Sequence, residues 1–407
     1  MKILMANKFY YIKGGSETYY FGLKNILEAK GHEVIPFAMK DERNFSSSYE
    51  KYFVDNIDYS NMNIIDKIKG ASKIIYNFQA KRKIEEIIND TKPDLVHLHI
   101  FQHQISPSIL HAIKRKNIPI IYTVHDLKSV CLNYKMLNNN NICEKCKGNK
   151  FYQCALNKCV KNSMFKSSIN VLEGYLHELI GSYKLIDMFV TPSEFYRDKL
   201  IEFGVPKNKI KFIPNFIDIS KFKPSYKNDG YYLYLGRLSE EKGLNTLIRA
   251  FTNIPEAKLK IVGNGPIEMD LKKYVNDNNI LNIEFEGFKQ GEELEYVIKN
   301  SKFVVIPSEW YENCPMSVIE SMAYGKPVIG ADIGGIPELI GNNCGYIFKS
   351  GSVNDLTNKI KETLYIDDKQ LEERGKNARK RVEDLYGEEK HYCEILKNYK
   401  EIINNYK

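Results

Sequence analysis

Short apolar runs alternate with longer helical periodicities along most of the chain, and this alternation limits the fold more than any other feature. Runs such as Lys2–Met5 and Tyr231–Leu235 have the length of strands. The segments Glu17–Lys30 and Leu244–Asn253 instead carry apolar residues at helical spacing. Strands that alternate with helices form βαβ units. The pattern therefore predicts an α/β protein with parallel sheets.

The expected strands fall into two groups, one in each half of the chain. In the first half they are Lys2–Met5, Val34–Phe37, Leu95–Leu98, Ile118–Val124, Met188–Val190 and Lys211–Ile213. In the second half they are Tyr231–Leu235, Leu259–Val262, Ile283–Glu286, Phe303–Ile306, Pro327–Gly330 and Gly345–Phe348. Both groups begin with a strand, a glycine-containing loop and a helix, which predicts two Rossmann-like domains in tandem.

A polar stretch with turn residues near Phe216–Asp229 separates the two groups. We therefore expect a first domain over residues 1–215, a second over 216–386 and a C-terminal helix over 387–407. Ligands bind at the carboxyl ends of strands in such sheets. With two such domains, a cleft between them is the expected site.

The charge of the chain is mild and dispersed. The formal net charge is +8, and lysines are scattered along the sequence rather than gathered in a patch, which argues against nucleic acid as the partner. A nucleic-acid-binding protein built on the cysteines remains an alternative, but it would use only residues 131–159. The sequence has no run of about 18 apolar residues, as a membrane-spanning helix would need. The apolar run at its start is too short for a signal peptide, so we expect a cytoplasmic protein.

The segment Pro307–Gly330 has the most informative pattern. An apolar strand ends at Ile306, a loop holds Glu312, and a helix is expected to begin near Pro315. A helix N-terminus offers backbone N–H groups to hydroxyls or phosphates. Glu320 lies just over one helical turn further on. Two surface carboxylates on a solvated helix are the alternative interpretation.

Two glycine-containing loops follow strands of the second half. In one loop, the Arg237 guanidinium can form bidentate hydrogen bonds and the Lys242 ammonium carries a localised positive charge. Both groups are suited to binding a diphosphate. In the other, Gly263 and Gly265 would let a ligand approach the backbone closely. Ordinary turns with solvated cations are the alternative.

Together these motifs resemble the donor-binding half of family-4 glycosyltransferases, which are retaining enzymes with the GT-B fold. The matching features are the Glu-x7-Glu spacing of Glu312 and Glu320, the Gly236-Arg237…Lys242-Gly243 loop, and the Gly-x-Gly of Gly263 and Gly265. Ile213–Asp218 at the junction and Gly14-Gly15 in the first loop also match. The resemblance implies two Rossmann-like domains facing a central cleft, with the C-terminal helix over 387–407 returning to pack on the first domain.

The resemblance also implies roles for these residues. Arg237 and Lys242 would neutralise the leaving nucleoside diphosphate, and Glu320 would hold the ribose hydroxyls. The donor sugar would lie against Glu312 and the backbone of Asn313, Cys314, Pro315 and Met316. Gly15, Gly263 and Gly265 would complete the donor site. No metal cofactor is expected for the transfer chemistry, because the cations and the helix dipole would stabilise the departing phosphate.

The first domain supplies a second set of candidates. His125 and Asp126 follow a strand, and the resemblance places such a histidine beside the donor sugar, where its neighbour would fix the tautomer. Gly14, His103, Asp126 and Asn215 are expected on the acceptor side. A structural role for His125 is the alternative. His97 and His99 share a strand face, which leaves a metal site open as a further alternative.

Five of the eight cysteines lie between Cys131 and Cys159. The CxxC of Cys143 and Cys146, with Cys154 and Cys159 after it, fits a structural zinc site with these four ligands. Cys131 could replace one of them. An iron–sulfur cluster, a redox dithiol and free thiols are the competing interpretations. Some family members carry a similar cysteine-rich insert.

Residues 63–89 combine isoleucines with lysines at helical spacing. Such a helix can lie on an anionic membrane, which predicts peripheral contact with the inner face of the cell membrane. The alternative is a helix that packs on its own domain.

The predicted function is transfer of a sugar from a UDP- or GDP-linked donor to a saccharide or lipid-linked acceptor, with retention at the anomeric carbon. The expected setting is the biosynthesis of capsule, lipopolysaccharide or another surface polysaccharide. A GT-B-fold nucleotide-sugar epimerase or hydrolase is the second hypothesis, and it would need an acid/base pair across the cleft.

Overall fold

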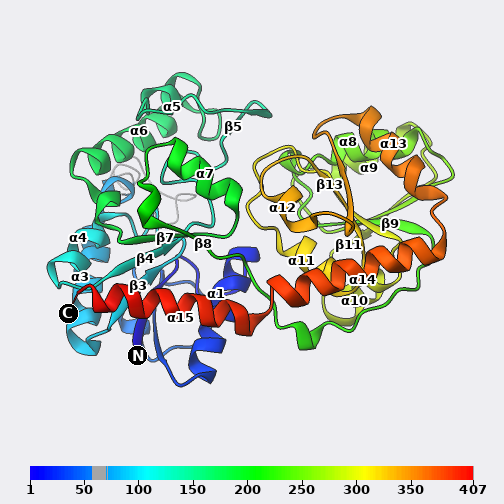
Figure 1. The fold of residues 1–407 in the computed structure, drawn as a ribbon. Helices are drawn as coiled ribbons and strands as arrows, with labels where there is room; N and C mark the ends of the chain where they lie inside the picture. Colours follow the sequence, from blue (N-terminus) through cyan, green and yellow to red (C-terminus); the bar gives the residue numbers. More distant parts are fainter. Residues whose placement is uncertain (57–69, 71, 407) are drawn as a thin grey trace. The chain divides into compact units, whose positions relative to one another are not determined.

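The computed structural model describes residues 1–56, 70 and 72–406. The chain divides into two compact units. Unit 1 comprises Met1–Asn138, Cys143–Ile213 and His391–Lys407, and unit 2 comprises Asn139–Ile142 and Pro214–Lys390. Each unit contains one parallel sheet with helices around it (Figure 1). The prediction of an α/β protein with two Rossmann-like domains is confirmed.

The sheet of unit 1 has the strand order β2-β1-β3-β4-β7-β8, and all of its strand pairs are parallel. Its strands are β1 (Lys2–Ala6), β2 (Glu33–Phe37), β3 (Leu95–Leu98), β4 (Ile120–Thr123), β7 (Met188–Thr191) and β8 (Ile210–Phe212). The helices of this part are α1 (Gly15–Ala29), α3 (Phe78–Thr91), α4 (Ser108–Arg115), α5 (Tyr152–Leu156), α6 (Met164–Leu179), α7 (Glu194–Glu202) and α15 (Glu388–Asn404).

The sheet of unit 2 has the order β11-β10-β9-β12-β13-β14, which is the strand order of a dinucleotide-binding Rossmann sheet. Its strands are β9 (Tyr231–Leu235), β10 (Lys258–Val262), β11 (Ile283–Gly287), β12 (Phe303–Ile306), β13 (Val328–Ala331) and β14 (Gly345–Phe348). Its helices are α8 (Leu244–Thr252), α9 (Glu268–Asp277), α10 (Gly291–Lys299), α11 (Met316–Ala323), α12 (Ile336–Ile340), α13 (Val353–Leu364) and α14 (Asp368–Leu385).

All twelve expected strands are present, and their ends differ from the expected ones by at most two residues. The strands are recognisable in the sequence because both faces of each sheet are covered. In β9, Tyr232 and Tyr234 pack into one apolar cluster, whereas Tyr231, Leu233 and Leu235 pack into another. Alternate side chains of a strand point to opposite faces, so a strand between two cores reads as a continuous apolar run.

The C-terminal helix α15 is anchored in unit 1 through its aromatic and histidine side chains. The hydroxyl of Tyr19 lies 3.1 Å from His391 Nε2, and the hydroxyl of Tyr399 lies 2.6 Å from His97 Nδ1. Ile395 and Tyr399 are completely buried. The apolar stripe of this helix therefore has its partner surface in unit 1.

The helix expected over residues 63–89 requires a correction. Residues 63–69 and 71 lie outside the described part of the chain, and within that part the helix is interrupted at Tyr76 and Asn77. Asn77 has an extended backbone, and its side chain accepts a hydrogen bond from the Ala80 N–H, so it caps a new helix, α3. The sequence pattern missed this boundary because the apolar spacing continues through it.

Candidate active site

The loops of unit 2 that carry the predicted donor-site residues all follow strands at the point where the strand order reverses. Arg237 follows β9, Gly263 follows β10 and Glu312 follows β12. In the sheet β9 lies between β10 and β12. Such a reversal leaves a crevice at the carboxyl ends of the strands, where ligands of open α/β sheets bind.

A charged pair joins two of these loops. Lys242 Nζ lies 2.6 Å from Glu312 Oε1, and Ser308 Oγ donates to the same oxygen at 2.7 Å. Glu312 is 6% exposed, and Lys242 Nζ also lies 5.3 Å from the centre of the Trp310 ring. The sequence predicted a role for both charged residues, but it gave no sign that they pair with each other or that Ser308 joins them.

Close backbone contacts hold these loops together. Gly243 has φ +70°, and a Cβ atom there would lie 1.9 Å from the Pro307 carbonyl oxygen. A Cβ on Gly263 would lie 1.9 Å from the Gly236 oxygen, and one on Gly265 would lie 2.1 Å from the Leu238 oxygen. The glycines expected to admit a ligand thus also permit one loop to pack on the next.

A second polar contact between the loops was not predicted from the sequence. Thr246 Oγ1 donates to Glu309 Oε1 at 2.6 Å, and the Glu309 N–H donates to the Glu241 carbonyl at 2.9 Å. Glu309 was visible in the sequence as a loop carboxylate. Only the tertiary contact identifies it as a residue that positions the Lys242 loop.

The loop before α11 is held by Asn215. The Asn215 side-chain amide donates to the Cys314 carbonyl at 2.9 Å, and its Oδ1 atom is buried without a partner. Asn215, expected on the acceptor side, thus supports the loop expected to hold the donor. Burial raises the pKa of the Cys314 thiol to about 12, so this side chain is a neutral core group.

The N-terminus of α11 lies directly after this loop. Pro315 is the N-cap, with extended ψ, and Met316 is the first helical residue. The first N–H groups of a helix have no acceptor within the helix, so this end can bind an anion or hydroxyls. Further along α11, burial raises the pKa of Glu320 above its usual range.

In unit 1, histidines and tyrosines form a buried network at the ends of β3 and β4. His99 Nδ1 lies 3.1 Å from His125 Nε2, and the His97 and His99 ring centres are 4.4 Å apart. Burial lowers the pKa of His97 and of His125 to about 3, so both imidazoles are neutral at pH 7. Of two neutral ring nitrogens in contact, one donates and the other accepts. The tautomers of His99 and His125 are therefore linked through this contact.

The other acceptor-side candidates lie in neighbouring loops of unit 1. Asp126 Oδ1 accepts from the Lys128 N–H at 2.9 Å, and burial raises the Asp126 pKa. His103 has φ +67°, and its Nδ1 lies 4.0 Å from Glu173 Oε2. Gly14 is the N-cap of α1, and Gly14 and Gly15 are both exposed. These residues share the carboxyl-end side of the sheet with His125, since they follow β1, β3 and β4.

The insert over residues 131–159 contains two short paired strands, β5 (Leu137–Asn138) and β6 (Asn141–Ile142), followed by α5. Leu132, Phe151, Cys146 and Cys154 form a small apolar cluster there. The insert therefore has a small apolar core of its own, because aromatic and aliphatic side chains flank the cysteines.

All five cysteines of the insert line one small cavity of about 10 Å³, which has room for about one atom. The Cys131 thiol donates to Asn133 Oδ1 at 3.1 Å, and a hydrogen bond from Cys154 lowers the pKa of Cys159 to about 7. Among the described residues, no group of three or more His, Cys, Asp or Glu side chains stands in an arrangement that could hold a metal ion.

Comparison with known proteins identifies the family. Residues 13–221 match the sequence profile described as Glycosyltransferase Family 4. The chain is a member of glycosyltransferase family 4. Residues 215–381 of this family-4 enzyme also match the profile described as Glycosyl transferases group 1, which covers most of unit 2.

Two curated glycosyltransferases are similar in sequence to the chain. An uncharacterized glycosyltransferase of Methanocaldococcus jannaschii is 27% identical over 410 residues, covering 99% of each chain. The amylovoran biosynthesis glycosyltransferase AmsK of Erwinia amylovora is 27% identical over 202 residues, covering 46% of the chain and 50% of AmsK.

Solved structures share the fold. The sucrose-phosphate synthase of Thermosynechococcus elongatus superposes with a TM-score of 0.73 at 19% identity, with 99% of each chain covered. The Anabaena protein HepE, solved in complex with UDP and glucose, gives a TM-score of 0.68 at 16% identity, with 98% and 100% covered. The family-4 chain is therefore a glycosyltransferase with the GT-B fold.

Proposed function

We propose that the enzyme transfers a hexose from a UDP- or GDP-linked donor to a saccharide or lipid-linked acceptor, with retention at the anomeric carbon. The proposed setting is the synthesis of a surface polysaccharide such as capsule or lipopolysaccharide, on the cytoplasmic side of the cell membrane. Two similarities support this choice: AmsK is named for the biosynthesis of a polysaccharide, and HepE was solved with UDP and glucose bound.

The observation that carries the proposal is the Lys242–Glu312 pair beside the N-terminus of α11, at the strand reversal of unit 2. Lys242 and Arg237 supply the two positive charges that a leaving diphosphate requires. Arg237 is exposed and therefore accessible to a ligand. Cations placed where negative charge develops lower the barrier to departure of the leaving group.

The pair with Glu312 gives Lys242 a second function in this proposal. Both hydrogen bonds to the Glu312 carboxylate reach Oε1, so Lys242 holds the carboxylate in place before the donor binds. When a diphosphate arrives, the Lys242 ammonium turns to the stronger anion and Ser308 retains Glu312. The carboxylate then accepts hydrogen bonds from hydroxyls of the donor sugar, together with the backbone of Asn313–Met316.

The remaining roles follow the chemistry of the side chains. Glu320 accepts from the ribose hydroxyls, and Gly263 and Gly265 shape the loop beside the diphosphate. In unit 1 the neutral His125 is suited to a sugar hydroxyl, since a neutral imidazole can both donate and accept. Gly14, His103 and Asp126 belong to the acceptor-facing loops, and Gly15 takes part in donor binding.

We also propose a structural zinc ion in the insert, held by Cys143, Cys146, Cys154 and Cys159 and without a part in the transfer. A shared cavity lined by thiols is the donor set that zinc prefers, and a cavity of about 10 Å³ suits a single ion. As the side chains stand they do not form a coordination shell, so zinc binding requires the thiols to turn toward the cavity.

Donor binding and product analysis test the proposed reaction. Calorimetry with UDP and GDP should show tight binding of one of them, and NMR of the product should show the anomeric configuration of the donor retained. Conversion of the donor without an acceptor, to an epimer or to free sugar, would instead support the epimerase or hydrolase hypothesis.

A further inference from the structure

The helix α6 has its polarity reversed relative to an ordinary surface helix. A surface helix buries an apolar stripe and exposes polar residues. In α6 the buried residues are all polar: Ser167, Asn170, Glu173 and His177. Of the apolar residues of the helix, Phe165, Leu172 and Leu179 are exposed, whereas Val171 packs against the apolar cluster of the insert. The hydrophobic effect within unit 1 therefore explains only part of its orientation.

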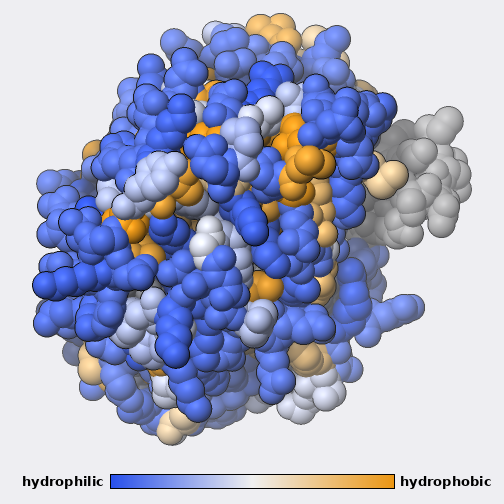
Figure 2. Space-filling view, turned by 90° about the vertical axis from the view of Figure 1, so that its right-hand side faces the viewer, coloured by the Kyte–Doolittle hydropathy of each residue, from blue (hydrophilic) through white to orange (hydrophobic). Residues whose placement is uncertain are grey.

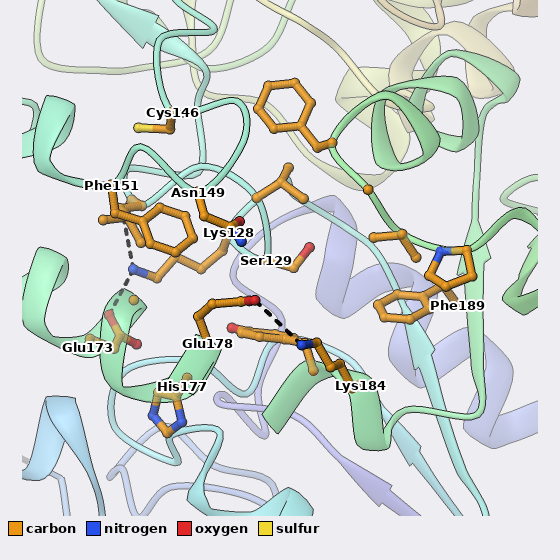
Figure 3. Close-up of a pocket in the computed structure, with 18 of the residues that line it drawn as sticks. Lys128, Ser129, Cys146, Asn149, Phe151, Glu173, His177, Glu178, Lys184 and Phe189 are labelled. Carbon is orange, nitrogen blue, oxygen red and sulfur yellow. Dashed lines mark hydrogen bonds and ion pairs between the residues drawn. The ribbon is translucent and has the colours of Figure 1, made fainter. Parts of the chain in front are cut away.

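Hydrogen bonds and an ion pair hold the polar face of α6 inward. Glu173 Oε2 accepts from Lys128 Nζ at 2.9 Å, and the two side chains point toward each other beside a cavity of about 240 Å³ (Figure 3). Asn170 Nδ2 donates to the Leu132 carbonyl at 3.0 Å. His177 lies 2.8 Å from Ser182 Oγ through Nδ1. Rotating the helix to bury its apolar side would break all of these contacts.

The outer side of α6 carries an apolar stripe at heptad spacing, formed by Phe165, Ile169, Leu172, Leu176 and Leu179. Phe165 is 71% exposed, Leu172 58% and Leu179 85%. The neighbouring α5, which lies beside α6 in unit 1 (Figure 1), adds exposed Tyr152 and Leu156. We call these seven residues the α5–α6 apolar face.

An exposed apolar surface of this kind marks a contact site. The contrast with other surface of the molecule is clear, because the face drawn in Figure 2 is largely hydrophilic with apolar residues in small areas. A stripe that extends over the whole of a 16-residue helix needs a partner that is apolar over a comparable length.

The charges around the α5–α6 apolar face indicate which partner fits. The segment from Lys145 to Leu172 contains no aspartate or glutamate. It contains six exposed lysines: Lys145, Lys147, Lys150, Lys158, Lys161 and Lys166. Glu178, next to Leu179, pairs with Lys184 at 3.6 Å. An apolar helix face bordered mainly by lysines matches an anionic lipid surface, where the apolar side chains enter the acyl boundary and the ammonium groups meet the headgroups.

We propose that the α5–α6 apolar face docks on an anionic phospholipid bilayer, with α6 lying in the plane of the interface. This surface is distinct from the basic segment expected over residues 63–89. No described helix is long and apolar enough to cross a membrane, so the contact is peripheral in the part of the chain that the structure covers. The inference goes beyond the proposed transfer reaction and does not depend on it.

Vesicle flotation without donor or acceptor tests the proposal. The wild-type chain should float with vesicles of phosphatidylglycerol and phosphatidylcholine. The double variant Leu172→Glu/Leu179→Glu should bind the vesicles at least about tenfold more weakly than the wild type, because two charges enter the apolar stripe. The matched control Met269→Glu/Leu281→Glu changes two apolar residues of unit 2 that are 79% and 96% exposed, and it should bind as the wild type does.

A second set of variants tests the lysines. Lys158→Gln/Lys161→Gln/Lys166→Gln should weaken binding to anionic vesicles, and added salt should weaken wild-type binding in the same way. Unchanged melting curves should accompany all variants, since the altered side chains are exposed.

Three results would overturn the proposal. One is a wild-type chain that fails to bind anionic vesicles, and another is a Leu172/Leu179 variant that binds as well as the wild type. The third is a wild-type dimer, seen by sedimentation without lipid, that this variant converts to a monomer, because the face would then be a protein interface. None of them would bear on the transferase proposal, which calorimetry and product analysis test separately.

Discussion

The two units share a parallel-sheet plan, yet the loops at the ends of their strands carry different chemistry. All eight histidines of the chain lie in unit 1, and His97, His99 and His125 form a buried neutral network there. The corresponding loops of unit 2 hold charged groups, with Lys242 bound to Glu312. One strand plan thus supports a neutral histidine network in unit 1 and a Lys242–Glu312 ion pair in unit 2.

The difference follows from what each set of loops must recognise under the proposed function. A leaving diphosphate develops negative charge and requires cations, whereas sugar hydroxyls are bound by groups that donate and accept without charge. Burial is tolerated in unit 1 because a neutral imidazole costs less to desolvate than an ion. In unit 2 the Lys242 ammonium is paired with the Glu312 carboxylate, and Arg237 is exposed.

The largest expected effect concerns the cysteines, which are clustered in unit 1 and isolated in unit 2. Protein purified under reducing conditions should contain about one equivalent of zinc, whose binding is worth on the order of 10 kcal/mol at structural sites. Cys146→Ser should abolish the zinc content, whereas Cys344→Ser in unit 2 should retain it. Elemental analysis measures both. Zinc far below one equivalent, without iron, would exclude a metal site in the insert.

The charged character of the unit 2 site is tested by its cations. Lys242→Ala and Arg237→Ala should each lower turnover by about 10²–10³-fold, because the departing diphosphate loses a counter-charge. Folding should be unchanged, since Ser308 still hydrogen-bonds Glu312. Lys273→Ala is the control, an exposed lysine of α9 paired with Asp277. Near-wild-type turnover in both site variants would contradict the donor-site assignment.

Replacing a glycine by alanine should lower the free energy of unfolding by different amounts in the two units. Gly263→Ala should lower the free energy of unfolding by on the order of 3 kcal/mol, because its φ is +133° and its Cβ would lie 1.9 Å from the Gly236 oxygen. In unit 1, Gly14→Ala should cost less than about 1 kcal/mol, because its Cβ would meet only Glu17 Oε2 at 3.9 Å. Urea denaturation measures both, and equal losses would refute the contrast.

The smallest expected effect is the pH dependence that His97 of unit 1 gives to the free energy of unfolding. His97 is fully buried and its pKa is lowered to about 3, so the unfolded chain binds a proton below pH 6.5 that the folded chain does not. Stability should therefore fall as the pH decreases from 6.5, by up to about 1.4 kcal/mol per pH unit for this histidine. The wild type is compared with the variant His97→Gln, which lacks the titrating imidazole.

Denaturation midpoints at pH 7.5, 6.5 and 5.5 measure this dependence. The slope for His97→Gln should be flatter than for the wild type, whatever the carboxyl groups contribute. Parallel slopes in the two proteins would show that His97 does not supply the acid sensitivity.

The fold was predictable to a large extent from periodicity. Buried strands such as β9 and β12 read as apolar runs because both faces are covered, and a helix such as α8 begins directly after a glycine. The pattern failed at Tyr76–Asn77, where a local side-chain cap ends one helix and starts another. It also gave no sign of the paired strands β5 and β6, whose two residues each are too few for a periodicity.

The candidate site was predictable as residue types in loops, but not as contacts. The sequence pointed to Lys242, Glu312 and His125, because the residue type and its position after a predicted strand can both be read from the sequence. The Lys242–Glu312 ion pair and the hydrogen bond between His99 and His125 join residues distant in the chain. No spacing rule reports such pairs, since they depend on how separate loops fold against one another.

The sequence by itself determined the α/β class, the strands and the residues that distinguish family 4, because hydrophobic periodicity and motif spacing are local properties. The tertiary structure alone decided which face of each element is covered. In α6 the contacts of Glu173, Asn170 and His177 turn a polar face inward and leave the leucines outside. The physical reason is that burial is a property of the neighbours that a side chain meets, and those neighbours come from elsewhere in the chain.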